Sequence, residues 1–390
     1  MLQFEQTIPL SLYIHLPWCI KKCPYCDFNS HEAGQGALQD EAYVDALIAD
    51  LEFELPRIWG RRIVSLFIGG GTPSLFSAAA LDRLLKAIQA RLNFSSGIEI
   101  TLEVNPGTAE AKKFKDYRQI GINRLSIGVQ SFNDEKLNSL GRIHSSKEAV
   151  NAIAMAREAG FDNINLDLMF GLPKQNANDA IRDLLMAIDQ GPEHISLYQL
   201  TIEPNTLYYS HPPDLPDEDL SWTMQQQGLQ QLNNNGFGQY EISAYAKDQY
   251  QCIHNLNYWQ FGDYLGLGAG AHGKLTDIAN GTINRYSRKR MPESYLQDAG
   301  KEEVITENRN LAVDDIVLEF MMNVLRLKEG VPLSLFNERT GLPFSTAEDR
   351  LRVAEAKGLV EWDSDTLKPT TNGQRYLNDL LQMFMPVKDE

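Results

Sequence analysis

The chain has 390 residues, of which 43% are hydrophobic, and this length suggests one large domain followed by a smaller one. Its 36 Lys+Arg residues against 52 Asp+Glu residues give a formal net charge of −16, which disfavours nucleic acid and anionic membrane surfaces as partners. The sequence shows neither a secretory signal nor an apolar run of about 18 residues, so we expect a cytoplasmic protein without a membrane helix.

Residues 11–202 alternate short apolar runs with longer amphipathic stretches, the pattern of repeated β-α units around a parallel sheet. Six strands are predicted, at residues 11–16, 64–68, 98–104, 124–129, 163–169 and 194–201. Helices are predicted at residues 41–55, 78–92, 108–120, 146–159 and 178–189, with Ser77 and Ser145 as N-caps of two of them. Polar or glycine residues follow most of the strands. Because active sites of β/α barrels lie at the carboxyl ends of the strands, these polar and glycine residues predict a site at that end of the barrel.

The sequence pattern changes after residue 300. Helices at 313–327, 333–340 and 346–357, a β-ribbon over 360–368 and a helix at 372–384 predict an α+β module of winged-helix-like type. We therefore place a barrel domain with its extension at residues 1–300 and a winged-helix-like domain at residues 301–390. Residues 311–390 contain nine Lys+Arg against 14 Asp+Glu, which opposes the DNA binding that such modules often perform.

Three of the four cysteines, Cys19, Cys23 and Cys26, follow the first predicted strand at C-x3-C-x2-C spacing. Three thiolates can hold three irons of a 4Fe-4S cluster and leave the fourth iron open to an outside ligand. Two alternatives remain open: a zinc site completed by His15 or His31, and a set of unrelated structural thiols. The spacing resembles that of the radical SAM family, in which S-adenosylmethionine occupies the open iron.

Other strand ends carry residues suited to hold a cofactor. The glycine-rich residues 69–73 end the second strand, and a backbone without side chains lets a ligand approach closely. Glu103 ends the third strand with its carboxylate predicted to face the barrel mouth, the alternative being a salt bridge with Arg142. Arg142 itself suits two-pronged pairing with a cofactor carboxylate. Gln130 and Asp167 complete the predicted ring around one site.

Together these residues resemble the coproporphyrinogen-dehydrogenase-like branch of the radical SAM family over nearly the whole chain. The sequences that carry the resemblance are Tyr13-Ile-His-Leu-Pro-Trp-Cys19, Gly69-Gly-Gly-Thr-Pro73, Glu103-Val-Asn-Pro106, Ser126-Ile-Gly-Val-Gln130 and Asp167-Leu-Met-Phe-Gly-Leu-Pro173. The resemblance implies an α/β partial (β/α)6 barrel that holds a 4Fe-4S cluster and S-adenosylmethionine. It also implies cofactor contacts at Tyr13, Tyr25, Gly70, Gly71, Thr72, Glu103, Gln130, Arg142 and Asp167, whereas no residue is assigned a catalytic role.

Within this branch, the oxygen-independent coproporphyrinogen III dehydrogenases have a further cysteine two residues after the last ligand, where this chain has Phe28. The chain instead contains His254-Asn-Leu-Asn-Tyr-Trp259, which resembles the H-N-x-x-Y-W sequence of the heme chaperones of the branch. Imidazole is a common axial ligand of heme iron, and aromatic rings can stack on a porphyrin. His254 is therefore a candidate heme ligand, and the alternative is a hydrogen-bonded core histidine.

The resemblance implies a heme carrier rather than an enzyme, with a coproporphyrinogen III dehydrogenase as the alternative function. The implied partners are heme, acceptor hemoproteins such as those of the respiratory chain, a reductant for the cluster and a second copy of the chain in a homodimer. Nucleic acid is not among them.

A few further residues are candidates for contact with heme or the cofactor. Four basic residues could pair with heme propionates or form a solvated loop: Arg285, Arg288, Lys289 and Arg290. Cys252 is interpreted as an inert buried thiol rather than a second heme ligand. The G-x-G-x-x-G sequence at residues 268–273 lies outside a β-α-β unit, so we interpret it as a tight loop, with His272 as a further candidate ligand.

Overall fold

The computed structural model of the chain describes residues 2–34, 38–107 and 112–386. Six parallel strands form the centre of the fold, and their order in space is their order along the chain. They are β1 (Leu10–Leu16), β4 (Arg62–Gly70), β5 (Asn93–Val104), β6 (Arg124–Gln130), β7 (Ile164–Phe170) and β8 (His194–Gln199). This arrangement confirms the predicted α/β fold with a six-stranded partial barrel.

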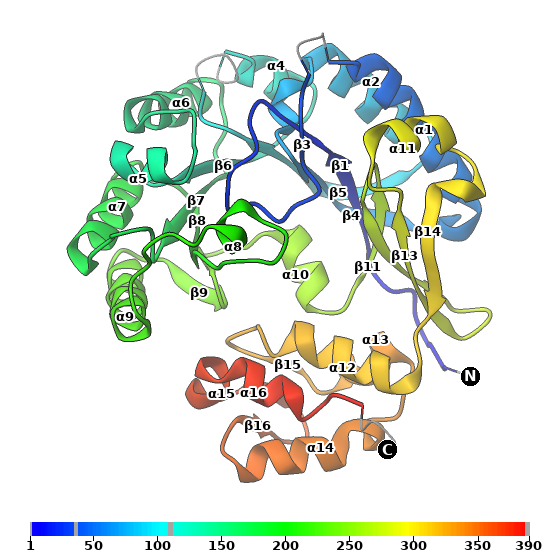
Figure 1. Ribbon diagram of the computed structural model, residues 1–390. Coiled ribbons are helices and arrows are strands. Elements are labelled where there is room, and N and C mark those ends of the chain that lie inside the picture. The colour runs from blue at the N-terminus through cyan, green and yellow to red at the C-terminus, as the bar shows by residue number, and fades with distance from the viewer. Residues whose placement is uncertain (1, 35–37, 108–111, 387–390) are drawn as a thin grey trace.

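Helices cover the outer face of these strands (Figure 1). The main ones are α1 (Asp40–Ile58), α2 (Ala78–Gln89), α6 (Ser146–Glu158) and α7 (Ala177–Asp189), each close to its predicted position. Ser77 and Ser145 accept hydrogen bonds from the first turns of α2 and α6, which confirms both predicted N-caps. Of the helix predicted at 108–120, residues 108–111 lie outside the described residues, and α4 (Phe114–Gln119) occupies the later part.

Shorter elements connect or flank the barrel units. The helices among them are η1 (Pro73–Leu75), α5 (Asp134–Ser139), α8 (Leu207–Ser210), α9 (Glu218–Asn234), α11 (Pro292–Asp298) and η2 (Glu302–Val304). Of these, α9 packs against α7 on the outer face and covers the β8 end of the sheet.

The sheet continues beyond the barrel at both ends and reaches 12 strands. At one end β11 (Asp263–Leu267) pairs in parallel with β1, followed by the antiparallel β12 (His272–Asp277), β13 (Thr282–Arg288) and β14 (Ile305–Asn310). At the other end β10 (Ala244–Ala246) and β9 (Gly238–Glu241) follow β8. The extension after β1 walls one side of the barrel mouth.

Alternation along the strands separates the apolar core from a polar barrel interior. In β1, Leu12 and Ile14 are fully buried in the core shared with the helices. Ser11, between them and Leu10, points to the opposite side, and its hydroxyl oxygen is 2.7 Å from that of Ser65 on β4. Because successive side chains of a strand face opposite sides, the even-numbered residues of β1 build the core while the odd-numbered ones face the barrel interior.

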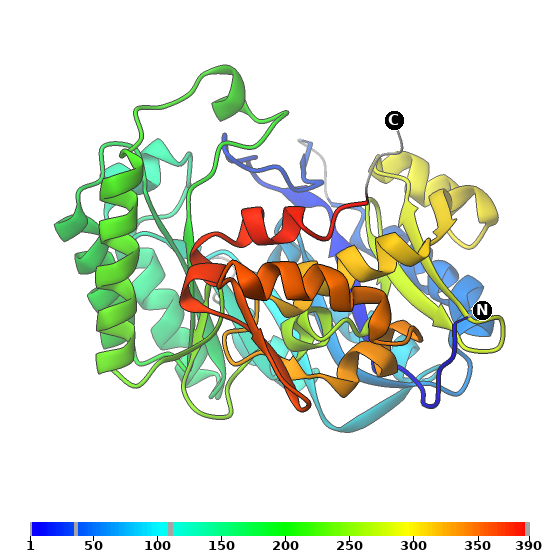
Figure 2. The same cartoon turned by 90° about the horizontal axis from the view of Figure 1, so that it is seen from below.

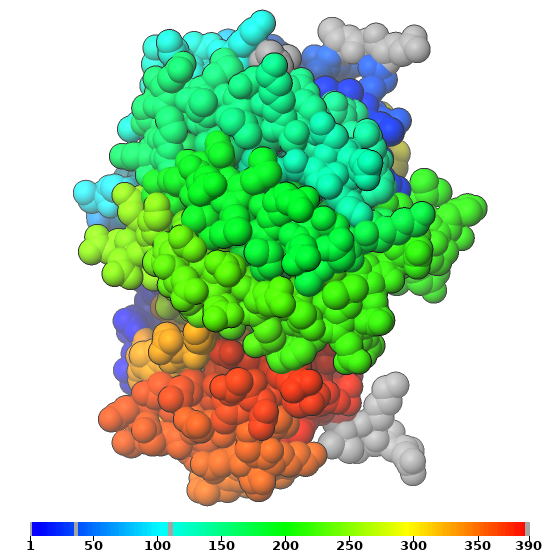
Figure 3. All heavy atoms as spheres, turned by 90° about the vertical axis from the view of Figure 1, so that its left-hand side faces the viewer, coloured from blue at the N-terminus to red at the C-terminus, as the bar shows by residue number. Residues whose placement is uncertain are grey.

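The C-terminal part forms a separate lobe, which lies below the barrel in Figures 1 and 3 and in front of it in the view of Figure 2. It contains α12 (Val313–Val324), α13 (Ser334–Thr340), α14 (Ser345–Ala356) and a small sheet of β15 (Val331–Pro332), β17 (Thr366–Pro369) and β16 (Val360–Trp362). This is the predicted winged-helix-like arrangement. The single helix predicted at 372–384 is instead two, α15 (Thr371–Arg375) and α16 (Leu377–Gln382), because Tyr376 between them has non-helical backbone angles.

One short helix, α10 (Ile253–Trp259), lies between the barrel and this lobe. It contacts β1, β4 and β11 on one side and α12 on the other. Beside it, the Arg326 guanidinium lies 4.3 Å from the ring centre of Trp259 and 2.9 Å from the Glu241 carboxylate. Residues 254–259, which resemble the heme chaperones, therefore lie in a helix that packs between the barrel and the C-terminal lobe.

In the part of the chain that the structure describes, no helix has the length and apolar character needed to cross a membrane.

Candidate functional site

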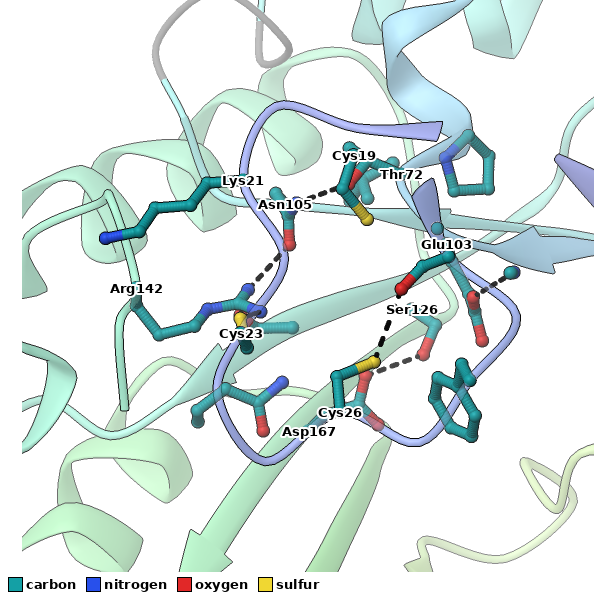
Figure 4. Close-up of a pocket in the computed structure, with 18 of the residues that line it drawn as sticks. Cys19, Lys21, Cys23, Cys26, Thr72, Glu103, Asn105, Ser126, Arg142 and Asp167 are labelled. Carbon is teal, nitrogen blue, oxygen red and sulfur yellow. Dashed lines mark hydrogen bonds between the residues drawn. The ribbon is translucent and has the colours of Figure 1, made fainter. Parts of the chain in front are cut away.

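The loop after β1 holds the three thiols at the barrel mouth. Two short strands, β2 (Trp18–Cys19) and β3 (His31–Glu32), pair in parallel and close the loop at its base. Within the loop the backbone amide of Cys26 donates to the carbonyl of Cys23 at 3.1 Å, which makes a tight turn. The side chains of Cys19, Cys23 and Cys26 are half-buried and line one cavity (Figure 4).

That cavity has a volume of about 360 Å³, which lies within the range of small-molecule sites. Most of the residues predicted to contact the cofactor line it together with the thiols: Tyr25, Gly70, Gly71, Thr72, Glu103, Gln130, Arg142 and Asp167. Tyr13 does not; it lines a second cavity, which shares Phe28, Gly70 and Glu103 with the first. The structure thus brings the predicted residues to one rim.

The described residues offer no ready-made site for a single zinc ion. Sulfur ligands of a tetrahedral zinc ion lie within about 4 Å of one another, because each Zn–S bond is about 2.3 Å long. Among the described residues, no group of three His, Cys, Asp or Glu side chains is arranged closely enough to hold one metal ion. His15, proposed as a fourth zinc ligand, is hydrogen-bonded through its ring nitrogens to the Tyr13 hydroxyl and the Asn29 carbonyl.

The glycine-rich segment after β4 is bound directly to the thiol loop. The backbone amides of Gly71 and Thr72 donate to the carbonyls of Leu16 and Trp18 at 2.8 and 2.7 Å. A Cβ atom at Gly71 would lie 2.6 Å from the Trp18 carbonyl oxygen, closer than real Cβ contacts allow. The absence of a side chain at this position therefore lets the two segments approach each other and fixes the thiol loop over the strand ends.

Two carboxylates face the cavity from neighbouring parts of the barrel. Glu103 accepts a hydrogen bond of 3.0 Å from the amide of Gly70. Arg142 instead donates to Asn105 and Gly128, so among the described residues the alternative salt bridge between Glu103 and Arg142 is not formed. Burial, and after it the negative charge of Asp167, raise the pKa of Glu103 to about 7. Burial also raises the pKa of Asp167, whose oxygens accept hydrogen bonds from Ser126 and Asn165. A cationic group in this cavity would stabilise the charged form of both carboxylates.

Arg142 is held in place by groups at the opposite wall. Its guanidinium donates to Asn105 Oδ1 at 2.6 Å and to the Gly128 carbonyl at 2.8 Å, and it lies 3.7 Å from Cys23 Sγ. Asn105 in turn donates to Thr72 Oγ1 at 2.9 Å. Asn105 thus connects the arginine to the glycine-rich segment, a role that its place at a strand end alone does not reveal.

Gln130 ends β6 in a strained conformation. Its φ of 67° lies in the left-handed region, which non-glycine residues rarely adopt, and its Oε1 accepts a hydrogen bond of 2.6 Å from the Tyr198 hydroxyl. Tyr198 lines the same cavity but carries no distinctive sequence signal. Strain at a strand end that faces a cavity is typical of a binding site.

His254 lies inside the barrel rather than at a surface. It is 2% exposed, and its ring centre is 4.9 Å from that of Tyr258 and 5.0 Å from that of Phe67. Nδ1 is 3.0 Å from the Ser65 hydroxyl, whereas Nε2 is buried with no hydrogen-bond partner among the described residues. Burial lowers the pKa of His254 to about 3, so the imidazole is neutral at physiological pH. In this conformation no face of the ring is open to a macrocycle.

The partial barrel and the thiol-lined cavity at its mouth define a radical SAM protein, and the radical SAM superfamily matches residues 13–187. The HemN C-terminal domain family matches residues 311–376. Proteins named heme chaperone HemW from Haemophilus influenzae and Escherichia coli are 49% and 48% identical to this chain, and each alignment covers 97% of it and 98% of the relative. The chain therefore belongs to the HemW family of radical SAM proteins.

A solved structure agrees at the level of the fold. Coproporphyrinogen III oxidase (HemN) of Escherichia coli, a radical SAM enzyme, superposes with a TM-score of 0.81 at 24% identity, over 97% of this chain and 90% of that one. A more distant relative, heme chaperone HemW of Bacillus subtilis, is 34% identical over 96% of this chain and 99% of its own length.

Proposed function

We propose that the protein is a heme carrier, which binds heme and passes it to acceptor hemoproteins. The observation that carries this proposal is the full-length similarity, at nearly half identity, to proteins named heme chaperone. Phe28 supports it from within the chain. It is 63% exposed on the thiol loop, at the position where the resemblance places a further cysteine in the coproporphyrinogen enzymes.

The cofactor residues follow from the first cavity. Cys19, Cys23 and Cys26 would hold the 4Fe-4S cluster, and the remaining wall residues would hold S-adenosylmethionine: Tyr25, Gly70, Gly71, Thr72, Glu103, Gln130, Arg142 and Asp167. When bound, the cluster and S-adenosylmethionine supply one-electron redox chemistry. The carboxylates of the wall can receive the cofactor's ammonium and hydroxyl groups, and Arg142 faces the thiols from the opposite side.

In this proposal His254 binds heme iron only if part of the chain moves. Because its ring is enclosed by Tyr258 and Phe67, iron could reach Nε2 only after α10 moved away from β4. The unpartnered Nε2 and the neutral state of the imidazole are suited to metal ligation once the helix has moved. A carrier that opens only toward its acceptor would use such a buried ligand during release.

The remaining partners follow from charge and chemistry. Reduced thiols point to the cytoplasm, where disulfides are rare, and the cluster requires a reductant. Acceptors are hemoproteins such as those of the respiratory chain, and a homodimer is the proposed assembly. Nucleic acid is not a proposed partner, because the C-terminal lobe has a net negative charge.

Anaerobic heme titration of the reconstituted protein tests the carrier function, followed by mixing with an apo-hemoprotein. We expect a heme spectrum that appears at stoichiometric heme and then moves to the acceptor. Absence of any absorbance change on heme addition would refute the proposal.

The complete cofactor cavity also favours a second candidate, oxidative decarboxylation of coproporphyrinogen III in the manner of a dehydrogenase. Anaerobic incubation of the reduced protein with coproporphyrinogen III and S-adenosylmethionine tests it. Formation of protoporphyrinogen in proportion to S-adenosylmethionine consumed would make this enzyme activity, and not heme carriage, the function.

A further inference from the structure

A second cavity opens beside the cofactor cavity. Its volume is about 540 Å³, and it is bounded by β1, the thiol loop and the strands β11–β14 that extend the barrel. Phe28, Gly70 and Glu103 line both cavities, so the two adjoin at the end of β4. A ligand in the second cavity would therefore lie next to the thiols and the cofactor residues.

The inner wall of this cavity is aromatic. Tyr13, Tyr258 and Tyr264 line it, and the ring centres of Tyr258 and Tyr264 are 4.3 Å apart. Phe28 stands at the shared edge of the two cavities and is 63% exposed. Flat aromatic surfaces of this kind suit a planar, largely apolar molecule. These rings, which come from β1, α10, β11 and the thiol loop, thus supply an aromatic surface of the character that a porphyrin requires.

One cation at the cavity is free to pair with a carboxylate. Of the four neighbouring basic residues, Arg285 is paired with Glu319, Arg288 with Asp50 and Glu54, and Lys289 with Asp298. Only the fourth, Arg290, is both exposed and without an ion pair among the described residues. Its Nε donates to Asn29 Oδ1 at 3.5 Å, and it lines the cavity. Asp27 and Glu307 also line the cavity and would direct an anionic group toward Arg290.

One histidine at the cavity is accessible. His272, the first residue of β12, is exposed, and its imidazole has no hydrogen-bond partner in the described part of the chain. Although the residue is exposed, part of its ring is desolvated at the cavity, which lowers the pKa of His272 and favours the neutral form that binds iron. The second histidine of the cavity, His15, is already hydrogen-bonded through both ring nitrogens. His272 is therefore the imidazole that a ligand in this cavity can reach without any movement of the fold.

We infer that the second cavity is the heme site, with His272 as an axial ligand of the iron and Arg290 as the partner of a propionate. This inference rests on the proposed heme-carrier function and deepens it by placing the cargo. It differs from ligation by His254, which Tyr13 and Tyr258 separate from the cavity.

Heme titrations of single variants test the inference, with the cluster reconstituted in every sample. We expect His272→Ala to lose the absorbance of histidine-ligated iron and to bind heme at least tenfold more weakly, and free imidazole to restore that absorbance. His272→Met should keep heme but change the ligand spectrum. Arg290→Gln should weaken binding several-fold and leave the spectrum of the parent unchanged.

Control variants distinguish an error in the inferred heme site from a failure of the proposed heme-carrier function. His211→Ala removes an exposed histidine outside both cavities and should behave like the parent. If His272→Ala keeps the parent's spectrum and affinity while His254→Ala loses them, the inferred site is wrong and the carrier function stands. If the parent itself binds no heme, the carrier function fails and the site with it. The iron and sulfide content of each variant is measured to check that the fold around the cavities is intact.

Discussion

The carboxylate of Glu99 accepts a hydrogen bond of 3.2 Å from the backbone amide of His254. The amide of Ile253 donates to the same carboxylate at 3.3 Å, so Glu99 satisfies the free amides at the start of α10. Glu99 lies on β5, four residues before Glu103. One strand therefore carries both the carboxylate that faces the cofactor cavity and the carboxylate that holds the helix with the chaperone-like sequence.

Glu99 also compensates a buried cation, and its replacement should be costly. The Arg124 guanidinium lies 3.8 Å from the carboxylate, and both side chains are almost fully buried. Glu99→Gln leaves this cation unpaired, so we expect the free energy of unfolding in urea to fall by about 3 kcal/mol. In the double variant Glu99→Gln/Arg124→Met, part of that loss should return. A double variant that loses more than the single one would contradict this account.

The exposed pair of Arg91 and Glu52 provides the matched control. Glu52 is half exposed, and ion pairs of that kind contribute about 0 to 1 kcal/mol. Glu52→Gln should therefore change the free energy of unfolding by less than about 1 kcal/mol in the same urea titration.

Three of the four cysteines should be required for iron binding, and the fourth should not. We expect Cys19→Ala, Cys23→Ala and Cys26→Ala each to lose the cluster, because each thiol lines the same cavity. Cys252→Ala should keep it, because that thiol is fully buried beside Glu99, away from the cavity. Iron and acid-labile sulfide are measured after anaerobic reconstitution. Stoichiometric zinc without sulfide in the parent would show that the thiols hold a different metal.

The sequence predicted the barrel well because its signals are local. Each of the six strands contains a buried run, and several of the helices that follow begin at a side-chain cap, as Ser77 and Ser145 illustrate. The strands β9–β14 were not predicted. Their attachment to the barrel joins distant segments: β11 lies beside β1, and β10 lies beside β8. Periodicity within a segment contains no information on such a partner.

The same distinction holds for the site. Glu103 and Asp167 were predictable because strand ends of a barrel meet at one rim. The role of Asn105 between Arg142 and Thr72 depends on the path of three separate loops, so no local signal reveals it. The burial of His254 agrees with the alternative stated for it, a hydrogen-bonded core histidine, but the packing of α10 across β4 that encloses it has no local signal.

The contact between Gly71 and the thiol loop predicts a loss of cluster without any change in ligands. Gly71→Ala would place a Cβ atom 2.6 Å from the Trp18 carbonyl oxygen, so the loop must move away from the strand ends. We expect lower iron and sulfide content and faster loss of the cluster in air. Gly34→Ala is the control, since a Cβ atom there meets no atom of the described residues within 4 Å. Equal iron content in the two variants would refute this role for the glycine.

Glu103 should make stability depend on pH. Its pKa is about 7 in the folded apoprotein because of burial, whereas an unfolded glutamate has a pKa near about 4.3. Between these values the folded state binds more protons, so the contribution of Glu103 to stability falls as pH rises and becomes constant above pH 7. Glu103→Gln removes this dependence. Its free energy of unfolding relative to the parent should rise by about 2 kcal/mol between pH 5.5 and pH 8.

Binding of S-adenosylmethionine should lower the pKa of Glu103, whereas burial raises it. If the ammonium group of S-adenosylmethionine lies beside Glu103, it favours the ionised carboxylate, and binding below pH 7 must release a proton. Affinity measured by calorimetry should therefore weaken as pH falls from 8 to 6 in the parent. Because Glu103→Gln cannot release that proton, it should bind more weakly at pH 8 and lose most of the pH dependence. A parent whose affinity is the same at pH 6 and pH 8 would place the ammonium away from Glu103.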